Sequence, residues 1–133
     1  MLRAIRRIAP FAVLATFAAV LAIPASSDAA STTICKLSTK KAESLGTSYV
    51  LYADGKAGYK VSATSCATGL KVVKAFQACR RKHGKAGRCT TAVVGFKCTE
   101  KRPSSLAIPT QFTGVVSCKK GSAKVTHTYQ QNL

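Results

Sequence analysis

The stretch Thr64–Gly84, TSCATGLKVVKAFQACRRKHG, decides how the rest of this chain folds, because it carries the clearest helical pattern. Thr64 or Ser65 supplies a side-chain oxygen that caps a helix N-terminus, and Gly84 supplies the left-handed position that commonly ends a helix. At 100° per residue, the apolar half of this helix contains Cys66, Leu70, Val72, Val73, Phe76 and Cys79. The opposite half contains Lys71, Lys74, Arg81 and Lys82. The stretch therefore predicts an amphipathic helix that buries one side and presents a basic one.

Short β-patterned segments precede the helix. Thr32–Leu37 is a β-prone run around Cys35. Tyr49–Tyr52 and Tyr59–Ala63 flank the turn signal Asp54-Gly55, which predicts a hairpin.

Further strands follow the helix. Ala92, Val94, Phe96 and Cys98 alternate with less apolar positions, and 112–118 and 123–129 repeat this pattern on either side of a turn at 119–122. The segment TEKRPSSLAIPT between Cys98 and Gln111 contains two prolines and predicts a loop. The predicted fold class is α+β, with one amphipathic helix packed on a small antiparallel sheet of about four to five strands.

The first 29 residues form a separate unit. Three arginines precede an apolar run from Ile8 to Ile23 and a small-residue end, the pattern of a secretory signal peptide cleaved after Ala29 or Ala30. The alternative is an uncleaved anchor, since 16 apolar residues fall just short of a membrane span. We expect 1–29 to be a signal peptide and 30–133 to be a single small secreted domain, extracellular or associated with a bacterial cell wall.

Charge and cysteine content set further limits on this domain. The chain carries a formal net charge of +17, and removing the leader leaves 18 basic and three acidic residues, a net charge of +15. Most of these cations must face solvent and attract anions. The six cysteines all follow the leader, and an even number in a small exported chain predicts a disulfide framework, for which 15 connectivities exist.

Several short motifs resemble a group of uncharacterised small secreted proteins of high-GC soil bacteria. They are Ser65-Cys66-Ala67, Gly95-Phe96-x-Cys98 and Val116-x-Cys118-x-x-Gly121, within a resemblance that spans 49–129. It implies export and the predicted fold, and it adds no information about an activity. Many of these proteins carry counterparts of four of the cysteines and lack Cys79 and Cys89. The resemblance thus implies an added local bridge, Cys79–Cys89, and our preferred pairing of the others is Cys66–Cys98 and Cys35–Cys118.

The sequence gives little evidence for a metal site or for a catalytic site. Cys79, His83, Cys89 and Cys98 are zinc-type ligands, but their spacing matches no familiar zinc site and exported thiols tend to pair, so we expect no metal and no cofactor. Three scattered carboxylates at 43, 54 and 100 offer no evident catalytic pair, and an even cysteine count leaves no free thiol as nucleophile. We expect a non-enzymatic protein.

The basic residues are the remaining signal. Cations near a helix C-terminus stabilise the helix, which explains why basic residues occupy Arg80–His83. This effect does not explain the high net charge of the whole domain. The candidate anion-binding residues are Lys71, Lys74, Arg81, Lys82, Lys85 and Arg88. Lysines at 97, 101, 119, 120 and 124 and Arg102 add charge elsewhere, so the basic surface is expected to be diffuse.

These features predict contact with anionic polymers or surfaces: cell wall, lipid headgroups or other polyanions. Nucleic acid is expected to bind only non-specifically, because the basic loop contains no aromatic residue for base stacking. One alternative is a protease-inhibitor-like or other protein-binding module that uses a disulfide-held loop. A second is a cationic antimicrobial protein. After signal cleavage the chain is not expected to be an integral membrane protein.

Overall fold

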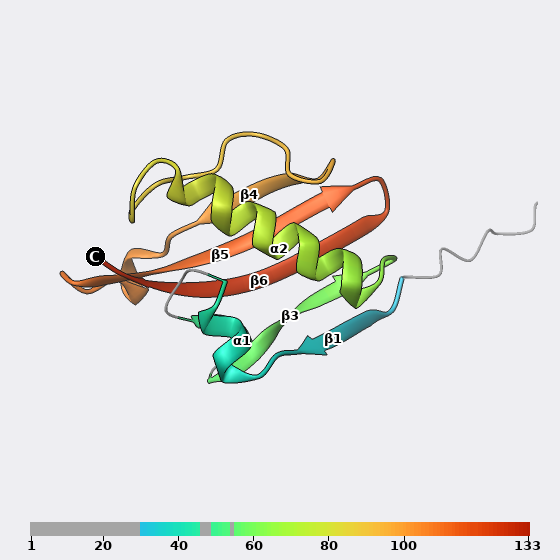
Figure 1. The fold of residues 1–133 in the computed structure, drawn as a ribbon, viewed down its shortest axis with the longest axis horizontal. Coiled ribbons are helices and arrows are strands. Elements are labelled where there is room, and N and C mark those ends of the chain that lie inside the picture. The colour runs from blue at the N-terminus through green and yellow to red at the C-terminus, as the bar shows by residue number, and fades with distance from the viewer. Residues whose placement is uncertain (1–29, 46–48, 54) are drawn as a thin grey trace, which may run out of the picture.

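The structure, a computed structural model, describes residues 30–45, 49–53 and 55–133 (Figure 1). The predicted signal peptide, 1–29, and Asp54 of the predicted turn lie outside the described residues. The elements in chain order are β1 (Thr32–Lys36), α1 (Thr39–Glu43), β2 (Tyr49–Ala53), β3 (Lys56–Ser62), α2 (Cys66–Arg81), β4 (Lys97–Lys101), the 3-10 turn η1 (Ser104–Leu106), β5 (Gln111–Lys120) and β6 (Ala123–Asn132).

The strands form one antiparallel sheet in the order β1-β3-β2-β6-β5-β4. The α+β architecture with α2 packed on the sheet is as predicted, but the sheet has six strands and the expected four to five is too few. The two edge strands explain the difference, since β1 buries only Cys35 and β4 buries no residue completely. Backbone pairing and the disulfides Cys35–Cys66 and Cys98–Cys118 hold these strands in place.

Helix α2 begins and ends where the sequence predicts. The Ser65 hydroxyl accepts a hydrogen bond from the Thr68 backbone N–H at 3.2 Å, and Gly84 adopts a left-handed conformation with φ of 87°. Val72, Val73 and Phe76 are fully buried against the sheet. The amphipathic pattern therefore predicts both the bounds of the helix and its buried side.

The segment before β4 differs from the prediction. Val93 and Phe96 exchange backbone hydrogen bonds of 2.9 and 2.8 Å across a two-residue turn, whose central residues Val94 and Gly95 both have positive φ. This turn reverses the alternation, so Val93 and Phe96 are buried and Val94 is 48% exposed. The strand predicted over 92–98 is wrong in its first half, and β4 continues to Lys101, into the predicted loop.

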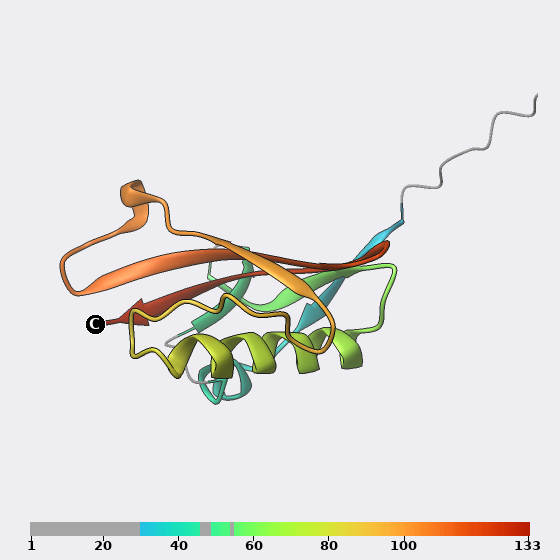
Figure 2. The same ribbon diagram turned by 90° about the horizontal axis from the view of Figure 1, so that it is seen from above.

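Both helices lie on one side of the sheet, and no helix of the described residues covers the other side (Figure 2). The core fills the space between the two layers. Its fully buried members include Val50, Val61, Val72, Val73, Phe76, Val116, Val125 and Tyr129. The β5–β6 hairpin, paired over ten positions, forms the centre of this arrangement and was predicted from its alternation.

The disulfides are Cys35–Cys66, Cys79–Cys89 and Cys98–Cys118. The expected Cys79–Cys89 bridge is present, whereas the expected Cys66–Cys98 and Cys35–Cys118 pairs are wrong. Cys98 lies directly opposite Cys118 in the β4–β5 ladder. Cys35 could not reach Cys118, because at least three strand spacings of about 4.8 Å separate β1 from β5 and a disulfide spans at most ~7 Å between Cα atoms.

Candidate anion-binding surface

Arg80, in the last turn of α2, is fully buried although it is an arginine. Its guanidinium lies over the Tyr129 ring, 4.3 Å from the centroid. It donates hydrogen bonds to the side-chain oxygens of Gln77 and Gln131, both at 2.6 Å, and to the Lys85 carbonyl at 2.9 Å. Burial lowers the pKa of Arg80, but an arginine keeps its charge at any ordinary pH. The interior thus contains a cation that is bonded to the loop after the helix.

His127 completes this buried group from β6. Its Nε2 lies 3.3 Å from the Gln77 side-chain nitrogen, whose partner oxygen already accepts from Arg80. Gln77 therefore donates to His127. Burial and, to a lesser extent, the Arg80 charge lower the pKa of His127 to about 3, so its ring is neutral. His127 therefore lies on the buried side of β6, between Val125 and Tyr129.

A second internal cation, Arg102, holds the same loop from β4. Its side chain bonds to the buried Glu100 carboxylate and lies over Phe112, 4.1 Å from the ring centroid. It also donates to the carbonyls of Ala86 and Gly87, both at 2.7 Å. Arg102 is therefore mostly enclosed, and its guanidinium connects β4 to the loop.

Tyr129 joins the two groups, because its hydroxyl donates to Glu100 at 2.6 Å. Burial, and next the hydrogen bond to Glu100, raise the pKa of Tyr129 to about 12.

These contacts fix the loop from Lys82 to Cys89. Three consecutive carbonyls, at 85, 86 and 87, accept hydrogen bonds from the two internal arginines, and the Cys79–Cys89 disulfide closes the loop onto α2. Hydrogen bonds to a charged donor are stronger than neutral ones. With its carbonyls turned inward, the loop leaves Lys82, Lys85 and Arg88 exposed to solvent. The internal cations therefore position the external ones.

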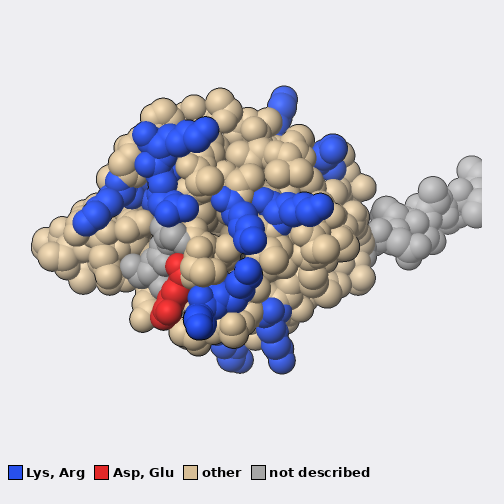
Figure 3. Space-filling model, in the orientation of Figure 1, with Lys and Arg blue, Asp and Glu red and all other residues tan. Residues whose placement is uncertain are grey.

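All six predicted site residues are exposed. We call them the helix-side surface: Lys71, Lys74, Arg81, Lys82, Lys85 and Arg88. None has an ion pair among the described residues, where the one ion pair is Arg102–Glu100. Figure 3 shows this face of the molecule, with cations spaced across it and little acidic surface.

The helix-side surface is elongated. Lys71 and Lys82 lie about 16 Å apart along the axis of α2, at 1.5 Å per residue. Arg81 and Lys85 are closer together and, with Gly84 and Gln131, line a shallow hollow of about 340 Å³. The structure thus brings Arg81 and Lys85 to one place and leaves Lys71 and Lys74 further along the helix. This shape suits an extended ligand better than a small one.

Several of the other lysines do not join this surface. Those on the sheet, at 97, 101, 119 and 124, lie on strands, and alternation with buried neighbours places them on the side that no helix covers. The basic residues therefore occupy two sides of the molecule, as a diffuse distribution predicts.

The zinc alternative is inconsistent with the cysteine pairing. Cys79 and Cys89 are bonded to each other and Cys98 to Cys118, so none of these sulfur atoms is available as a thiolate ligand. No three His, Cys, Asp or Glu side chains cluster as metal ligands in the described part of the chain.

Sequence reasoning missed Arg80 and Arg102 as internal residues. The sequence does contain a pattern that predicts burial of Arg80: at 100° per residue it lies about 20° from Val73 around the helix, in the middle of the apolar half. It was assigned instead to the basic end of the helix. No comparable signal marks Arg102, since its partners come from β4, β5 and the loop at 86–87.

No helix within the described ranges is long and apolar enough to span a membrane. Comparison with protein families, with curated proteins and with solved structures finds no match to this chain.

Proposed function

We propose that this chain is an exported, non-enzymatic domain that binds linear anionic polymers through the helix-side surface. The observation that supports this most directly is the fixed loop, in which Arg80 and Arg102 hold three carbonyls and thereby present Lys82, Lys85 and Arg88 outward. A preformed set of charges loses less conformational entropy on binding than a mobile set. Three disulfides in a small domain agree with an oxidising compartment outside the cell.

Electrostatics favours a polyanion as the ligand. The surface has six exposed cations without carboxylate partners among the described residues, and at physiological salt charges interact over about 8 Å. A single small anion would meet one or two of these cations, since the surface extends over about 16 Å along α2. A polymer with regularly spaced phosphates, of the kind found in bacterial cell walls, would meet them in sequence.

Membrane insertion and base stacking are less well supported. The apolar side of α2 is buried in the core, so it is not free to enter lipid, which weighs against the antimicrobial alternative. Phe76 is the one Phe, Tyr or Trp of α2 and is fully buried, and the loop 82–89 contains no Phe, Tyr or Trp. The surface therefore has no platform for nucleic acid bases. Leakage of dye from anionic vesicles at micromolar protein would favour the antimicrobial function instead.

The direct test is retention on immobilised poly(glycerol phosphate) with elution by salt. Lys71→Gln/Lys74→Gln/Lys82→Gln removes three charges from the helix-side surface. In nucleic acid complexes each neutralised phosphate adds about 0.7–0.9 to the slope of log affinity against log salt, so we expect the slope to fall by roughly 2.

The matched control removes three charges outside the surface, as Lys40→Gln/Lys41→Gln/Lys56→Gln. It should retain most of the wild-type slope. Elution of the wild type below ~0.15 M salt would mean that the attraction is too weak for the proposed binding. Equal losses in the two variants would show that net charge alone is responsible. Either result would remove the proposed surface.

A second candidate is a protein-binding loop. Residues 104–110 are all exposed, with Leu106 53% and Ile108 59% accessible, and the segment around η1 projects from the end of the sheet (Figure 2). Its ends are held by Arg102 on one side and by backbone hydrogen bonds between Ile108 and Gln111 on the other. Saturable inhibition of one protease in a broad panel, abolished by Leu106→Ser, would support it. A panel without inhibition would count against an inhibitor.

A further inference from the structure

The uncovered side of the sheet carries a row of lysines in direct register. Lys97 on β4 pairs with Lys119 on β5, and Lys119 pairs with Lys124 on β6. Each alternates with a residue that faces the helix layer, Cys98, Cys118 and Val125, so all three side chains stand on the uncovered side. Directly opposite like charges destabilise a sheet. This row is therefore a cost to folding that packing does not explain.

No acidic side chain in the described part of the chain compensates the row. Of the two acidic side chains in the described residues, Glu43 belongs to α1, on the other side of the sheet, and Glu100 has a side chain only 5% exposed and bonded to Arg102. The lysines themselves are exposed. Their charge is thus free to attract an anion from solvent.

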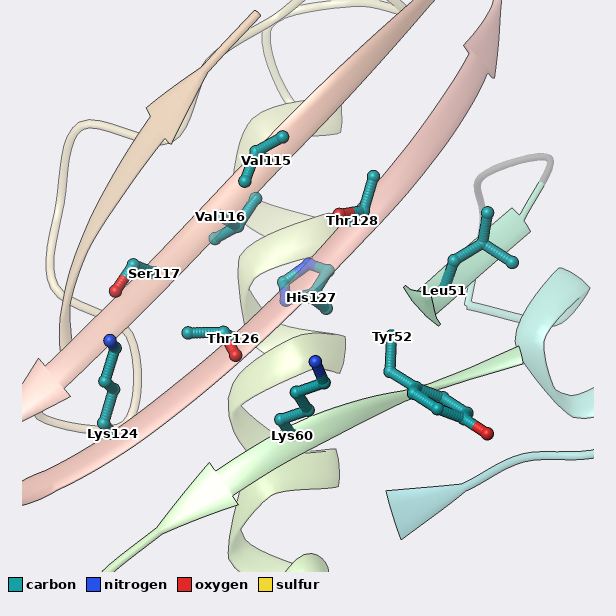
Figure 4. Close-up of a pocket in the computed structure, with 10 residues that line it drawn as sticks. All are labelled: Leu51, Tyr52, Lys60, Val115, Val116, Ser117, Lys124, Thr126, His127 and Thr128. Atoms are coloured by element: carbon teal, nitrogen blue, oxygen red, sulfur yellow. The ribbon is translucent and has the colours of Figure 1, made fainter. Parts of the chain in front are cut away.

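Hydroxyl groups lie in the adjacent row of the same side. Thr99, Ser117 and Thr126 are in register across β4, β5 and β6, and Thr126 pairs with Lys60 on β3. A shallow hollow of about 250 Å³ in this region is lined by Lys60, Lys124, Ser117 and Thr126 among others. Figure 4 shows the Thr126 side chain between those of Lys60 and Lys124. Ammonium and hydroxyl donors together are suited to phosphate oxygens.

We propose that these residues form a second anion-binding surface, the sheet-side surface, and that the protein bridges two chains of a linear phosphate polymer. The sheet-side surface comprises Lys60, Lys97, Lys119, Lys124, Ser117 and Thr126. Cross-strand Cα atoms are about 4.5–5.5 Å apart, so successive lysines offer a charge every ~5 Å across the strands.

Bridging follows from the geometry of the layers. The helix-side surface lies on α2 and its loop, and the sheet-side surface lies on the opposite side of the same sheet (Figure 2). A straight polymer segment on one side cannot reach the other, so the two sides engage separate segments. Bridging rests on the proposed function, because it needs polymer binding at the helix-side surface. The sheet-side surface itself is inferred independently of that proposal.

Turbidity and light scattering of poly(glycerol phosphate) titrated with the folded domain test the proposal. The wild type should produce a scattering maximum near charge equivalence that disappears at excess protein, when each polymer chain is saturated separately. Lys97→Gln/Lys119→Gln/Lys124→Gln should still bind immobilised polymer but scatter at least fivefold less. Since this variant removes like-charge repulsion, its melting temperature should not fall below that of the wild type, so misfolding cannot account for the loss.

The other variants separate this proposal from the first. Lys40→Gln/Lys41→Gln/Lys56→Gln has the same net charge as the sheet-side variant and should scatter like the wild type. Scattering by the sheet-side variant equal to that of this control would overturn the second surface, and so would a wild type that binds without scattering. If anionic vesicles cluster and the polymer does not, the occupant is a lipid surface and the proposal is wrong. The proposed function fails separately, if Lys71→Gln/Lys74→Gln/Lys82→Gln leaves polymer retention unchanged.

Discussion

Replacing Arg80 by methionine removes a buried cation while keeping a side chain of similar length. The variant leaves three acceptors without their donor: the buried side-chain oxygens of Gln77 and Gln131 and the partly buried carbonyl of Lys85. It also removes the guanidinium from the Tyr129 ring.

Two opposing terms set the size of the effect. Each unsatisfied buried acceptor costs about 1–3 kcal/mol, which gives about 2–6 kcal/mol for the two glutamine oxygens, and the partly buried Lys85 carbonyl adds less. The guanidinium no longer has to be desolvated, and this offsets part of the loss. The acceptors of Arg80 are neutral, so its removal leaves no uncompensated charge. We expect Arg80→Met to lower the free energy of unfolding by about 3 kcal/mol, which for a domain of this size is a fall of roughly 10–25 °C in melting temperature.

Urea denaturation at pH 7 with the disulfides intact measures this change. Arg81→Met is the matched control, because Arg81 is exposed and its side chain makes a single hydrogen bond, to the Gln77 carbonyl at 3.2 Å. It should change stability by less than about 0.5 kcal/mol. If Arg80→Met costs less than ~1 kcal/mol, water replaces the guanidinium in this site and Arg80 does not hold the loop.

Three further predictions concern other parts of the core. Folded His127 has a pKa of about 3 against 6.5 for the ordinary side chain, so between these values only the unfolded state binds the proton. The free energy of unfolding should therefore decline as pH falls from 6.5 toward 3, by at most ~1.4 kcal/mol per pH unit. A pH scan of His127→Gln should show a shallower decline. Replacing Cys79 and Cys89 by serine should cost about 3 kcal/mol in thermal unfolding for a loop of ten residues, and equal stability would mean that the arginines alone close the loop. Gly114→Ala would place a Cβ against the buried Tyr129 ring and should cost about 1–3 kcal/mol in urea unfolding; an unchanged midpoint would show that the ring has room to move.

Local signals in the sequence predict the parts of the fold that depend on local interactions. The cap at Ser65, the left-handed Gly84 and the apolar residues between them are sufficient to place α2. The β5–β6 hairpin has a short turn and clear alternation, so it is also predictable.

Strand and disulfide pairing between residues far apart in the chain could not be predicted from local patterns in this way. The Cys98–Cys118 bridge depends on the β4–β5 register, and that register depends on the reversal of alternation at Val94-Gly95, which the sequence pattern does not reveal. The short helix α1, which buries Ala42, was likewise not predicted from its polar sequence. The candidate surface was predicted as a set of exposed residues, but the contacts that hold its loop come from the buried Arg80 and from Arg102, which lies in a segment expected to be a loop.

Arginine and lysine have different roles in this chain: two arginines make internal contacts, and the exposed lysines do not. Arg80 and Arg102 each combine an aromatic face with fork-like hydrogen bonds to carbonyl or side-chain oxygens, for which a planar, weakly hydrated guanidinium is suited and an ammonium is not. The exposed lysines make no comparable contacts in the described residues, and three of them stand opposite one another at a cost. A chain of equal net charge with lysine at 80 and 102 would therefore attract the same polymers from a distance, but it would lose the bonds that position its loop. Arg80→Lys/Arg102→Lys separates these contributions: we expect a salt slope near that of the wild type together with weaker binding at every salt concentration.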